Sequence, residues 1–575
     1  MNPTELEKLR HSLAHLLAAA VLKLYPDAKP TIGPAIDNGF YYDFEFANPI
    51  AESDLPKIEN VMREILKSWD TFEQEEISAE DAKERFVHNP YKLELIEEIA
   101  GKKEPVTLYT SGTFTDLCRG GHIENISEID PKAFALTRIA GAYWRGDEKN
   151  KMLTRIYGLA FNTQKELEAY KKMLEESEKR DHRKLGKELD LFTFSELVGS
   201  GLPLFTPKGT AMRDAIVDKI SSIQKKYGYE KVTIPHITKP ELYKVSGHFE
   251  KFGNDLFKVT SRESEFIMKP MNCPHHTQIF ASTSRSYKDL PIRYAETTMV
   301  YRDEQTGELL GLSRVRAITQ DDAHIFCAPE QIKSEIRNIV KTIEEFYTAL
   351  GMYTEGGFRV ALSTHDQKNS EKYLGGEEKW KLAESTLEEI AREENLPYTT
   401  SEGEAAFYGP KLDFMFKDAI GREWQLGTVQ LDFVMPERFG LTYTDKEGRK
   451  QTPVMIHRAI AGSLERFMSV IIEHFAGAFP YWLSPVQVKV LPISEHQNAF
   501  AYKVFEFLEK HNIRAEIDDT DEGLGKKIRK AKVEKVPYIF VIGDKEKNSE
   551  SVTIESRDKG NIGFHPFDKI LDQLV

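Results

Sequence analysis

The segment 294–326, YAETTMVYRDEQTGELLGLSRVRAITQDDAHIF, constrains the fold of this chain more than any other stretch. Two apolar runs flank a polar turn, which predicts an antiparallel hairpin. Arg302 and Glu304 lie two residues apart, so they share one face of an extended strand, and a return strand beginning near Leu312 brings Arg314 beside them. Such a hairpin could bind a magnesium-bound triphosphate, or it could be a salt-bridged hairpin on a solvated surface.

Two flanking segments favour the phosphate-binding interpretation. Upstream, a helix-like run over residues 209–227 leads into YEKVTIPHI, where Pro235 ends a short strand as an edge or interface residue would. Downstream, PVMIHRAIAGSLERFMSVIIEHF joins His457 to a Gly-Ser turn and to a helix that carries Arg466. Arginine suits this chemistry because its planar guanidinium binds phosphate oxygens in pairs and stays charged.

In this order the three segments resemble motifs 1, 2 and 3 of the class II aminoacyl-tRNA synthetases, and the chain is similar to the threonyl-tRNA synthetase family. The resemblance runs from about Leu9 to the C-terminus and includes HSLAHLL, DLCRGGH, GAYWRGD, KPMNCPHH, TQDDAHIFC, AFYGPKLDF, GTVQLDF and MIHRAIAGSLERF. It implies an α+β multidomain protein. A class II catalytic core with an antiparallel sheet would lie between an α+β N-terminal editing domain and a C-terminal α/β anticodon-binding domain.

The length of the chain indicates several domains, and its net charge indicates that any RNA contact is local. A chain of 575 residues is long enough for three or more domains with separate cores. The formal net charge is -14, so the chain as a whole does not attract nucleic acid. RNA would therefore contact local basic faces. One candidate is GKKIRKAKVEK, residues 525–535, although a solvated helix face would look similar.

The cysteine content and hydropathy favour a cytoplasmic protein. Cys118, Cys273 and Cys327 are too few and too scattered for a disulfide framework, which suggests a reducing compartment. We find no run of about 18 apolar residues that would span a membrane, and no charged-then-apolar leader at the start. We therefore expect no membrane contact.

The predicted domains are residues 1–161 (editing), 162–190 (a charged connecting helix), 191–483 (catalytic) and 484–575 (anticodon-binding). Thr163 and Glu166 have capping-box spacing at the start of the connecting helix. The last domain alternates strands and helices in a βαβαβ pattern, which predicts a small, mainly parallel sheet. Relatives usually carry a further N-terminal domain of ubiquitin-like fold, and we expect that domain to be lacking here because the editing unit begins almost at Met1.

The first domain contains two pairs of potential metal ligands. His11 and His15 are four residues apart and share one helix face, while Cys118 and His122 flank a flexible Arg-Gly-Gly turn. From spacing alone, a tetrahedral zinc site and a pair of ordinary helix histidines are equally open.

The family resemblance adds a third interpretation of these residues. In threonyl and alanyl enzymes the corresponding four residues form a hydrolytic pocket, which is commonly metal-free in threonyl enzymes. By the same match Lys92 and Asp116 would line the pocket in this chain.

A second candidate metal centre comes only from the resemblance. Cys273, His324 and His457 lie 51 and then 133 residues apart, and from spacing alone each would be an ordinary core or surface residue. Their sequence settings match the ligands of one Zn²⁺ per chain in threonyl enzymes. His275 is a further candidate, for which we expect a supporting role.

Such a metal would solve a specificity problem. Valine is nearly isosteric with threonine, whereas an open zinc position can bind both the amino group and the side-chain hydroxyl. Serine has that hydroxyl too, and its missing methyl is worth only about 1–3 kcal/mol. A second site that hydrolyses seryl-tRNA is then required, which the editing domain would supply.

The resemblance also assigns roles around the ATP and threonine pockets. Arg302 would stabilise charge at the α-phosphate, Arg314 and Arg466 would hold the distal phosphates, and Glu304 would position adenine or Mg²⁺. The other expected contacts are Ile318 on adenine, Gln320 and Asp322 on the threonine amine or hydroxyl, Tyr408, Gln425 and Gln430 lining the pocket, and Met271 at its border. His248 would assist transfer of threonine to the terminal ribose of tRNA(Thr).

The expected partners are tRNA(Thr), ATP, L-threonine and a second copy of the chain. Arg529 and Glu546 match anticodon-contacting positions, but Thr520 and Asp521 replace a common Arg-Asn pair, which should weaken or redirect that contact. The segment around Pro235 resembles one that forms the class II dimer interface. The alternatives are a non-catalytic paralogue and a metal-dependent hydrolase that uses the N-terminal His/Cys cluster.

Overall fold

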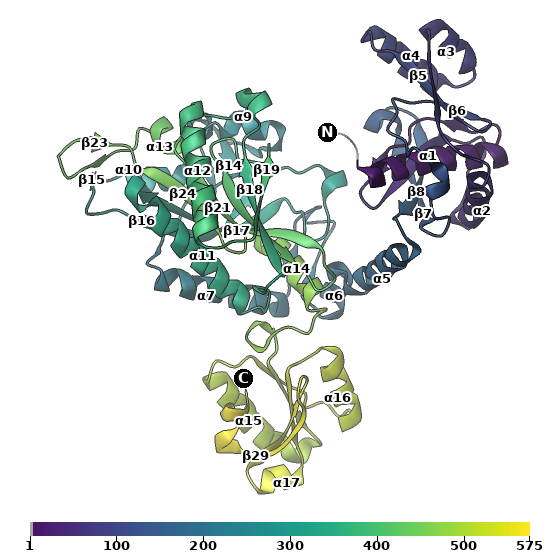
Figure 1. Ribbon diagram of the computed structural model, residues 1–575. Coiled ribbons are helices and arrows are strands. Elements are labelled where there is room, and N and C mark those ends of the chain that lie inside the picture. The colour runs from purple at the N-terminus through teal and green to yellow at the C-terminus, as the bar shows by residue number, and fades with distance from the viewer. Residues whose placement is uncertain (1–3, 575) are drawn as a thin grey trace. The chain divides into compact units, whose positions relative to one another are not determined.

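The structure is a computed structural model that describes residues 4–574 (Figure 1). The chain divides into two compact units, one extending through residue 175 and the other beginning at residue 176. Within the described residues, no helix is both long and apolar enough to cross a bilayer.

The first unit is built around helix α1, Glu5–Leu24, which begins at Thr4 with a capping box. The Glu7 amide donates to Thr4 Oγ1 at 3.2 Å, and the Thr4 amide donates back to the Glu7 carboxylate. The apolar residues of α1 pack with helix α2, Leu55–Leu66, on an antiparallel sheet. That sheet contains β1 Lys29–Pro30, β2 Ala35–Ile36, β3 Gly39–Glu45, β7 Phe134–Tyr143 and β8 Met152–Ala160.

A smaller antiparallel sheet completes this unit and carries part of its pocket. Its strands are β4 Glu73–Ile77, β5 Val106–Ser111 and β6 Phe114–Leu117, and its helices are α3 Ala79–Arg85 and α4 Pro90–Gly101. Asp116 lies on β6, Cys118 directly follows that strand, and Lys92 lies on the first turn of α4.

The predicted single connecting helix is two helices, α5 Gln164–Arg180 and α6 His182–Glu188. The predicted contact between Thr163 and Glu166 is confirmed, since the Glu166 amide donates to Thr163 Oγ1 at 3.3 Å. Asp181 ends the first helix because its backbone is non-helical, and its carboxylate accepts a hydrogen bond of 2.8 Å from the Arg183 amide as the N-cap of α6.

The catalytic part of the second unit is organised by an eight-stranded sheet with the order β11-β16-β17-β24-β21-β20-β18-β19. Its strands are β11 Glu230–Lys231, β16 Ile292–Tyr301, β17 Ala317–Cys327, β18 Phe358–Thr364, β19 Tyr398–Glu402, β20 Lys411–Lys417, β21 Glu423–Asp432 and β24 Val454–Ala459. All neighbouring pairs are antiparallel except the two edge pairs, which confirms the antiparallel sheet expected for a class II core.

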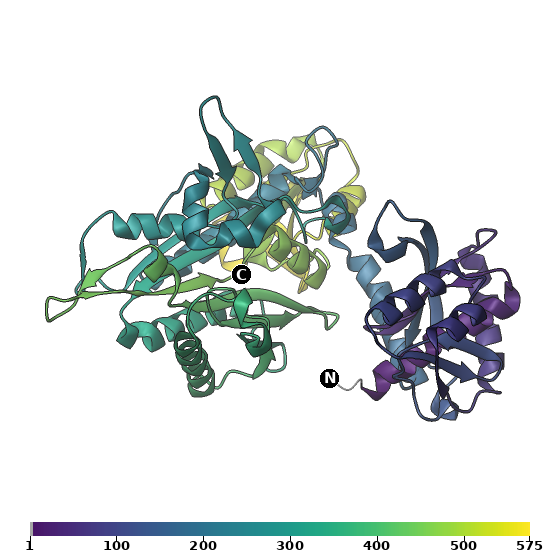
Figure 2. The same ribbon diagram turned by 90° about the horizontal axis from the view of Figure 1, so that it is seen from above.

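Helices cover this sheet and form one large apolar core with it (Figures 1 and 2). They are α7 Pro207–Lys226, α11 Ile332–Thr348, α12 Glu377–Glu393 and α14 Leu464–His474. Smaller elements surround the site: β9 Phe192–Thr193, β10 Leu204–Phe205, β12 Ile237–Thr238, α8 Pro240–Ser246, α9 His248–Phe252, β13 Lys258–Thr260, β14 Glu265–Met268, α10 Cys273–Ala281, β15 Arg285–Ser286, α13 Met435–Arg438, β22 Tyr443–Thr444 and β23 Lys450–Gln451.

The predicted hairpin is confirmed as β16 and β17, but its ends differ from the prediction. β16 ends at Tyr301 and β17 begins at Ala317, so the expectation that Arg302 and Glu304 lie on the strand, and that the return strand begins near Leu312, was wrong. The Arg302 amide still donates to Arg316, whereas the Glu304 amide turns back to the Arg302 carbonyl, which ends the ladder. We call residues 302–316 the hairpin loop.

The C-terminal part confirms the predicted βαβαβ order, but its sheet is not mainly parallel, because two of its four strand pairs are antiparallel. Parallel strands β25 Val488–Pro492, β26 Ala515–Ile517 and β27 Tyr538–Ile542 alternate with α15 Asn498–Lys510 and α16 Leu524–Val533. An additional antiparallel pair, β28 Ser551–Ser556 and β29 Gly560–Pro566, follows the short helix α17 Asp544–Asn548. The sheet order is β26-β25-β27-β28-β29.

Candidate active site

Strand register places the main candidate residues in one row across the large sheet. Gln430 on β21 lies opposite His457 on β24, and His457 lies opposite His324 on β17. Alternate residues of a strand share a face, so Gln320 and Asp322 lie on the same face of β17 as His324. Residues that are separated by more than 100 positions in the chain therefore form one surface.

Cys273 joins this row from the first turn of α10. Cys273, His324 and His457 are all buried, and one ligand-type atom of each lies within 4.8 Å of the others. The structure therefore brings together three side chains whose spacing in the sequence did not suggest a site.

Neighbouring side chains orient both histidines of this cluster. His457 Nε2 donates to Asp432 Oδ2 at 2.9 Å, which leaves Nδ1 for a ligand. His324 Nδ1 shares a hydrogen bond of 2.8 Å with His276 Nδ1, which leaves Nε2. The supporting residues Asp432 and His276 were missed at the sequence level, because only the fold places them beside the predicted ligands.

The donor set fits Zn²⁺. One thiol and two imidazoles with a supporting carboxylate are the ligands that a zinc site with an open position uses. Burial, and then the charges of Asp322 and Asp432, raise the pKa of the Cys273 thiol well above its usual range. A bound cation would offset this effect, because it stabilises the thiolate and the surrounding carboxylates together.

A polar group without a protein partner lies on the same strand as this cluster. Gln320 Oε1 is buried and has no hydrogen-bond partner among the residues that the structure describes. Asp322 accepts a hydrogen bond of 3.0 Å from Asn272 Nδ2, and burial raises the pKa of its carboxyl group. Because buried polar groups are normally paired, a free acceptor here indicates a polar ligand.

Tyr408 packs against the same row of residues. Its hydroxyl donates to Gln430 Oε1 at 2.5 Å, and its ring stacks on His457 with centroids 4.7 Å apart. Met271 precedes Cys273 by two residues, and its carbonyl accepts from the Tyr243 hydroxyl at 2.7 Å. The register shift at the β-bulge after Phe414 places Gln425 on the same face of β21 as Thr428, and both side chains donate to Asp413 Oδ1, at 2.8 and 2.7 Å.

The three candidate phosphate-binding arginines differ in burial and in their partners. Arg302 lies over the Phe252 ring at 5.0 Å, and its Nε is buried without a partner among the described residues. Arg314 binds Glu304 at 2.7 Å and Glu308 at 2.8 Å. Burial, and then the charge of Arg314, lower the pKa of Arg466, which is consistent with an incomplete anion site.

Two further predicted residues lie close to this surface. Ile318 is half-buried and shares its strand face with Gln320. His248 is buried, with Nδ1 2.8 Å from Ser246 Oγ and Nε2 3.6 Å from Cys273 Sγ. Burial, followed by the charges around His457 and Arg302, lowers the pKa of His248 to about 3, so its imidazole is neutral at pH 7.

The four predicted residues of the first unit also converge. His11 Nε2 lies 3.1 Å from Cys118 Sγ, and His122 Nε2 lies 3.3 Å from the same sulfur. His15 completes a group whose ligand-type atoms lie within 4.8 Å of one another. Asp116 lies behind them, 2.5 Å from Lys92 Nζ and 3.5 Å from His15 Nδ1.

Burial favours the uncharged forms of Cys118 and His122 in this N-terminal pocket. Burial raises the pKa of the Cys118 thiol to about 12 and lowers the pKa of His122 to about 2. The Tyr42 hydroxyl, missed by the sequence analysis, donates to Asp116 Oδ2 at 2.5 Å. Neutral imidazoles can accept a proton from water or ligate a metal, so the geometry keeps both chemistries open.

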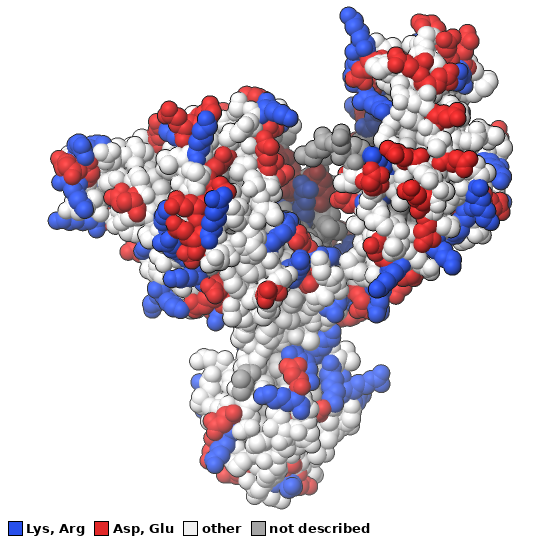
Figure 3. Space-filling model, viewed as in Figure 1, with Lys and Arg blue, Asp and Glu red and all other residues white. Residues whose placement is uncertain are grey.

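The candidate anticodon residues differ in exposure. Arg529 is exposed on α16, together with Lys526, Lys530 and Lys532. Figure 3 shows Lys and Arg side chains gathered on the face of the C-terminal part where α16 lies. Glu546 is buried, and its carboxylate accepts from the Gly543 amide at 3.0 Å and from Thr553 Oγ1 at 2.8 Å.

Three family models match separate parts of the chain. The class II tRNA synthetase core domain (G, H, P, S and T) matches residues 257–475, and the anticodon binding domain matches 487–575. The threonyl and alanyl tRNA synthetase second additional domain matches residues 106–157. Together with the antiparallel sheet and the row of site residues, these matches define a class II aminoacyl-tRNA synthetase.

Individual relatives show which family of class II synthetases the chain belongs to. A threonine–tRNA ligase of Porphyromonas gingivalis is 50% identical over 561 residues, covering 96% of this chain and 85% of the relative. The ligase of Thermus thermophilus is 48% identical over 580 residues, covering 98% and 87%. This chain belongs to the threonine–tRNA ligase family.

Solved structures of threonyl-tRNA synthetases are also similar to this chain. The RNA binding domain of threonyl-tRNA synthetase from Cryptosporidium parvum is 38% identical with a TM-score of 0.65, covering 68% of this chain and 97% of that one. A threonyl-tRNA synthetase from Aeropyrum pernix is 30% identical with a TM-score of 0.60, covering 67% and 91%. A Giardia lamblia prolyl-tRNA synthetase, 18% identical with a TM-score of 0.53, covers 68% and 75% and supports the fold alone.

Proposed function

We propose that threonine activation takes place on the sheet face that carries Gln430, His457 and His324, with one Zn²⁺ per chain bound by Cys273, His324 and His457. The observation that carries this proposal is the convergence of three buried ligand atoms within 4.8 Å beside an unpartnered Gln320 oxygen. When bound, zinc supplies a Lewis-acidic position for the amino and hydroxyl groups of threonine.

The protein side chains then hold both substrates. Asp322 and Gln320 accept hydrogen bonds from the threonine ammonium or hydroxyl group, while Tyr408, Gln430, Gln425 and Met271 border the side-chain pocket. Arg302 stabilises the charge that develops on the α-phosphate as the threonine carboxylate attacks and pyrophosphate departs. Arg314 and Arg466 bind the distal phosphates with Mg²⁺, Glu304 positions adenine or that Mg²⁺, and Ile318 packs on the adenine ring.

Transfer to tRNA(Thr) uses the buried His248. Its neutral imidazole takes part in moving the proton of the terminal ribose hydroxyl as the threonyl ester forms. Burial keeps this imidazole neutral at pH 7, so a ring nitrogen can accept a hydrogen bond from the ribose hydroxyl.

Editing of seryl-tRNA(Thr) would use the N-terminal pocket. His11, His15, Cys118 and His122 surround the ester, and Lys92 and Asp116 fix the surrounding charge. A hydrolase that binds its own metal through the same four residues is the alternative, and metal analysis of a Cys273→Ala variant separates them. One zinc per chain that is lost with Cys273 supports the assignment, whereas zinc that persists supports the alternative.

The remaining assignments follow the family pattern. We propose the boundaries 1–161, 162–190, 191–483 and 484–575, a cytoplasmic homodimer whose contact includes the segment around Pro235, and anticodon recognition by the last domain. The exposed Arg529 supports a contact with RNA, whereas the Glu546 carboxylate already accepts from the Gly543 amide and from Thr553 on β28.

The amino-acid-dependent exchange of pyrophosphate into ATP tests the activation site. We expect Arg302→Ala to lower this threonine-dependent exchange by about 100-fold to 1,000-fold, because it removes charge stabilisation at the reacting phosphate. Arg392→Ala, at an exposed arginine paired with Glu388, is the matched control and should leave the rate unchanged. Retention of exchange by Arg302→Ala would remove the proposed role, and a panel of amino acids in the same assay tests the specificity.

A further inference from the structure

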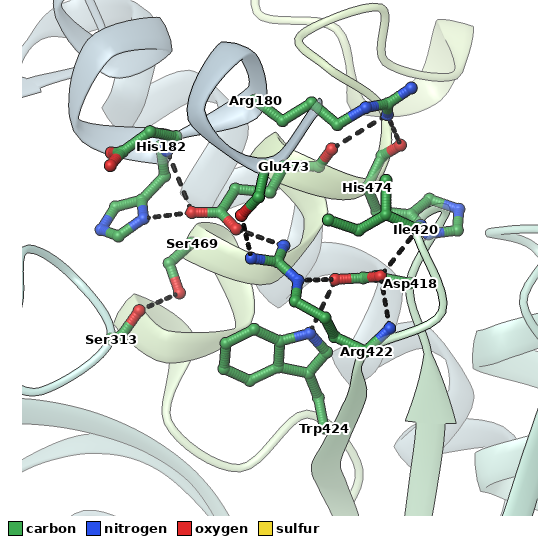
Figure 4. A network of polar contacts seen from close by, with 12 residues as sticks. Arg180, His182, Ser313, Asp418, Ile420, Arg422, Trp424, Ser469, Glu473 and His474 are labelled. Carbon is green, nitrogen blue, oxygen red and sulfur yellow. Dashed lines mark hydrogen bonds and ion pairs between the residues drawn. The ribbon is translucent and has the colours of Figure 1, made fainter. Parts of the chain in front are cut away.

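A buried carboxylate, Glu473, joins helix α6 of the connecting segment to two segments of the catalytic part (Figure 4). Glu473 lies one residue before the end of α14 and is 8% exposed. Its Oε1 accepts hydrogen bonds from the His182 backbone amide at 3.1 Å and from His182 Nδ1 at 2.7 Å. Its Oε2 accepts from Arg422 Nη2 at 2.5 Å, in the turn between β20 and β21. One side chain thereby fixes α6, α14 and that turn together.

His182 extends this network to the hairpin loop. Its Nε2 accepts a hydrogen bond of 3.1 Å from the Leu312 backbone amide. Because Nδ1 donates to the Glu473 carboxylate and Nε2 accepts from an amide, both bonds form together only when the imidazole is neutral and protonated on Nδ1.

The loop backbone lies directly on the His182 ring. Gly311 has a φ of +49°, and a Cβ added there would lie 2.3 Å from His182 Nε2. No side chain fits between the loop and the ring at this position. A second contact supports the same placement, since Ser313 Oγ lies 2.9 Å from Ser469 Oγ on α14.

These contacts determine where two phosphate-binding arginines lie. Arg314 follows Leu312 by two residues, and Glu304 and Glu308 of the same loop bind its side chain at 2.7 and 2.8 Å, so its position depends on the position of the loop. Arg466 lies on α14, where its carbonyl accepts from Ser469 Oγ at 2.7 Å. The separation of the two guanidinium groups therefore depends on how the loop is held against α6 and α14.

The cluster of Asp181, His182 and Glu473 also has the geometry of a metal site. Its potential ligand atoms, however, already form hydrogen bonds within the protein. Asp181 binds Arg183 through its carboxylate, and both ring nitrogens of His182 have partners. Arg180 also joins α5 to the end of α14, because its Nη1 donates to the carbonyls of Glu473 and His474 at 3.2 and 3.0 Å. The cations beside Glu473 favour an internal support over a metal ligand.

We propose that His182 is a positioning residue for ATP: through Glu473 on one side and the Leu312 amide on the other, it holds the hairpin loop so that Arg314 and Arg466 meet the distal phosphates together. This inference rests on the proposed phosphate role of Arg314. It adds a residue of the connecting segment, 130 positions away from the loop, to the determinants of ATP affinity.

Two substitutions at His182 separate its two hydrogen bonds. Asn places an amide nitrogen near the position of Nδ1 and keeps the bond to Glu473, but leaves the Leu312 amide unpaired. Gln reaches the position of Nε2 with an oxygen and can accept from Leu312. We expect His182→Asn to raise the KM for ATP about fivefold to thirtyfold in pyrophosphate exchange, as the loss of a buried hydrogen bond would, with the KM for threonine within about twofold.

Recovery of the ATP affinity in His182→Gln distinguishes a positioning role from a purely structural role. We expect His182→Gln to recover most of the ATP affinity, whereas a purely structural role would lower the melting temperature of both variants without a selective change in the KM for ATP. His474→Asn, at a histidine of the same helix end whose Nδ1 has no partner among the described residues, is the matched control. An unchanged KM for ATP in a folded His182→Asn variant overturns the proposal.

A variant of the loop itself keeps the test decisive if His182→Asn does not fold. Gly311→Ala should push the loop away from the His182 ring and raise the KM for ATP by a similar factor. Gly307→Ala, in the same loop but with no atom within 4 Å of the added Cβ, should leave it unchanged. Equal effects of the two alanines would contradict the proposal.

Arg314→Ala distinguishes the two levels of inference. If Arg314→Ala leaves the KM for ATP unchanged, the proposed phosphate role itself fails. If Arg314→Ala raises the KM while His182→Asn and Gly311→Ala do not, only the positioning role of His182 is overturned.

Discussion

One hydrogen bond decides which nitrogen of His457 is left for a metal. Because Asp432 Oδ2 lies 2.9 Å from Nε2, the ring presents Nδ1 to the cluster. The Asp432 carboxylate is itself fixed, since Oδ1 accepts from the amides of Val434 and Met435 at 2.7 and 2.8 Å. Residues that hold a ligand in this way commonly change metal affinity by 10-fold to 100-fold, roughly, when replaced.

The Asp432→Asn variant tests this support. We expect its zinc affinity to fall by about 10-fold to 100-fold, because the amide can present its nitrogen to Nε2 and no longer fixes the tautomer. The measurement is zinc content after dialysis against graded chelator concentrations. Asp445→Asn, which removes a hydrogen-bonded carboxylate from a turn outside the cluster, is the control. Equal zinc retention in both variants would count against the assignment.

The neutral histidines of the N-terminal pocket make its stability depend on pH. Burial lowers the pKa of His122 from about 6.5 to about 2, so the unfolded chain binds a proton at mildly acidic pH that the folded chain does not. Stability is therefore fully present above pH 6.5 and is lost as the pH falls below 6.5 towards 2. The slope for one such group is up to about 1.4 kcal/mol per pH unit.

We predict that His122→Gln flattens this dependence. Between pH 6.5 and 5, the free energy of unfolding of the first unit should fall less steeply than in the wild type, by up to about 1.4 kcal/mol per pH unit. Calorimetric unfolding at several pH values gives the comparison. His88→Gln, at an exposed histidine of the same unit, should keep the wild-type slope, and a matching slope in His122→Gln would disprove the neutral assignment.

At the scale of elements, a buried ion pair fixes three of them beside the site. Asp321 on β17 accepts from Arg458 Nη1 at 2.9 Å on β24 and from Gln224 Nε2 at 3.1 Å on α7. It also accepts from the amides of Ile460 and Ala461, which lead into α14. Asp322 follows Asp321 on β17, and His457 precedes Arg458 on β24. This ion pair therefore helps to position both residues of the site.

The Asp321→Asn variant should destabilise the catalytic part by about 3–5 kcal/mol, because it leaves the Arg458 charge buried without a full counterion. Denaturant unfolding measures this loss. Glu345→Gln, which breaks a surface ion pair with Lys226 of α7, should cost about 0–1 kcal/mol and serves as the control. A loss below about 1 kcal/mol for Asp321→Asn would show that the pair is dispensable.

At the scale of the whole molecule, the two candidate sites lie in separate compact units. The activation site draws its residues from the large sheet of the second unit, whereas the N-terminal pocket is complete within the first. We therefore expect damage to one site to spare the other.

The double variant His11→Ala with His15→Ala tests this separation. We expect seryl-tRNA hydrolysis to fall by about 100-fold, as the loss of positioned acid–base groups would cause, while threonylation stays within about twofold. Hydrolysis of pre-charged seryl-tRNA and aminoacylation with threonine are the two measurements. His88→Ala is the control, and seryl-tRNA hydrolysis at the wild-type rate in the double variant would exclude the proposed editing pocket.

The strand pattern and the turn signals of the sequence were sufficient for the β16–β17 hairpin and for the βαβαβ order of the C-terminal part. They could not place the end of β16, because the Glu304 amide turns to the Arg302 carbonyl and the ladder stops there. The break at Asp181 was also missed, since a charged stretch with a helical composition continues across it.

The amino-acid sequence by itself determined the residue types and the local periodicities, and through the motif resemblance it identified Cys273, His324 and His457 as a group. Only the tertiary structure decided that Asp432 and His276 orient those histidines, and that His182 supports a loop 130 residues away. The physical reason is that periodicity reports the face on which a side chain lies, whereas a hydrogen bond between distant segments depends on how helices and strands pack.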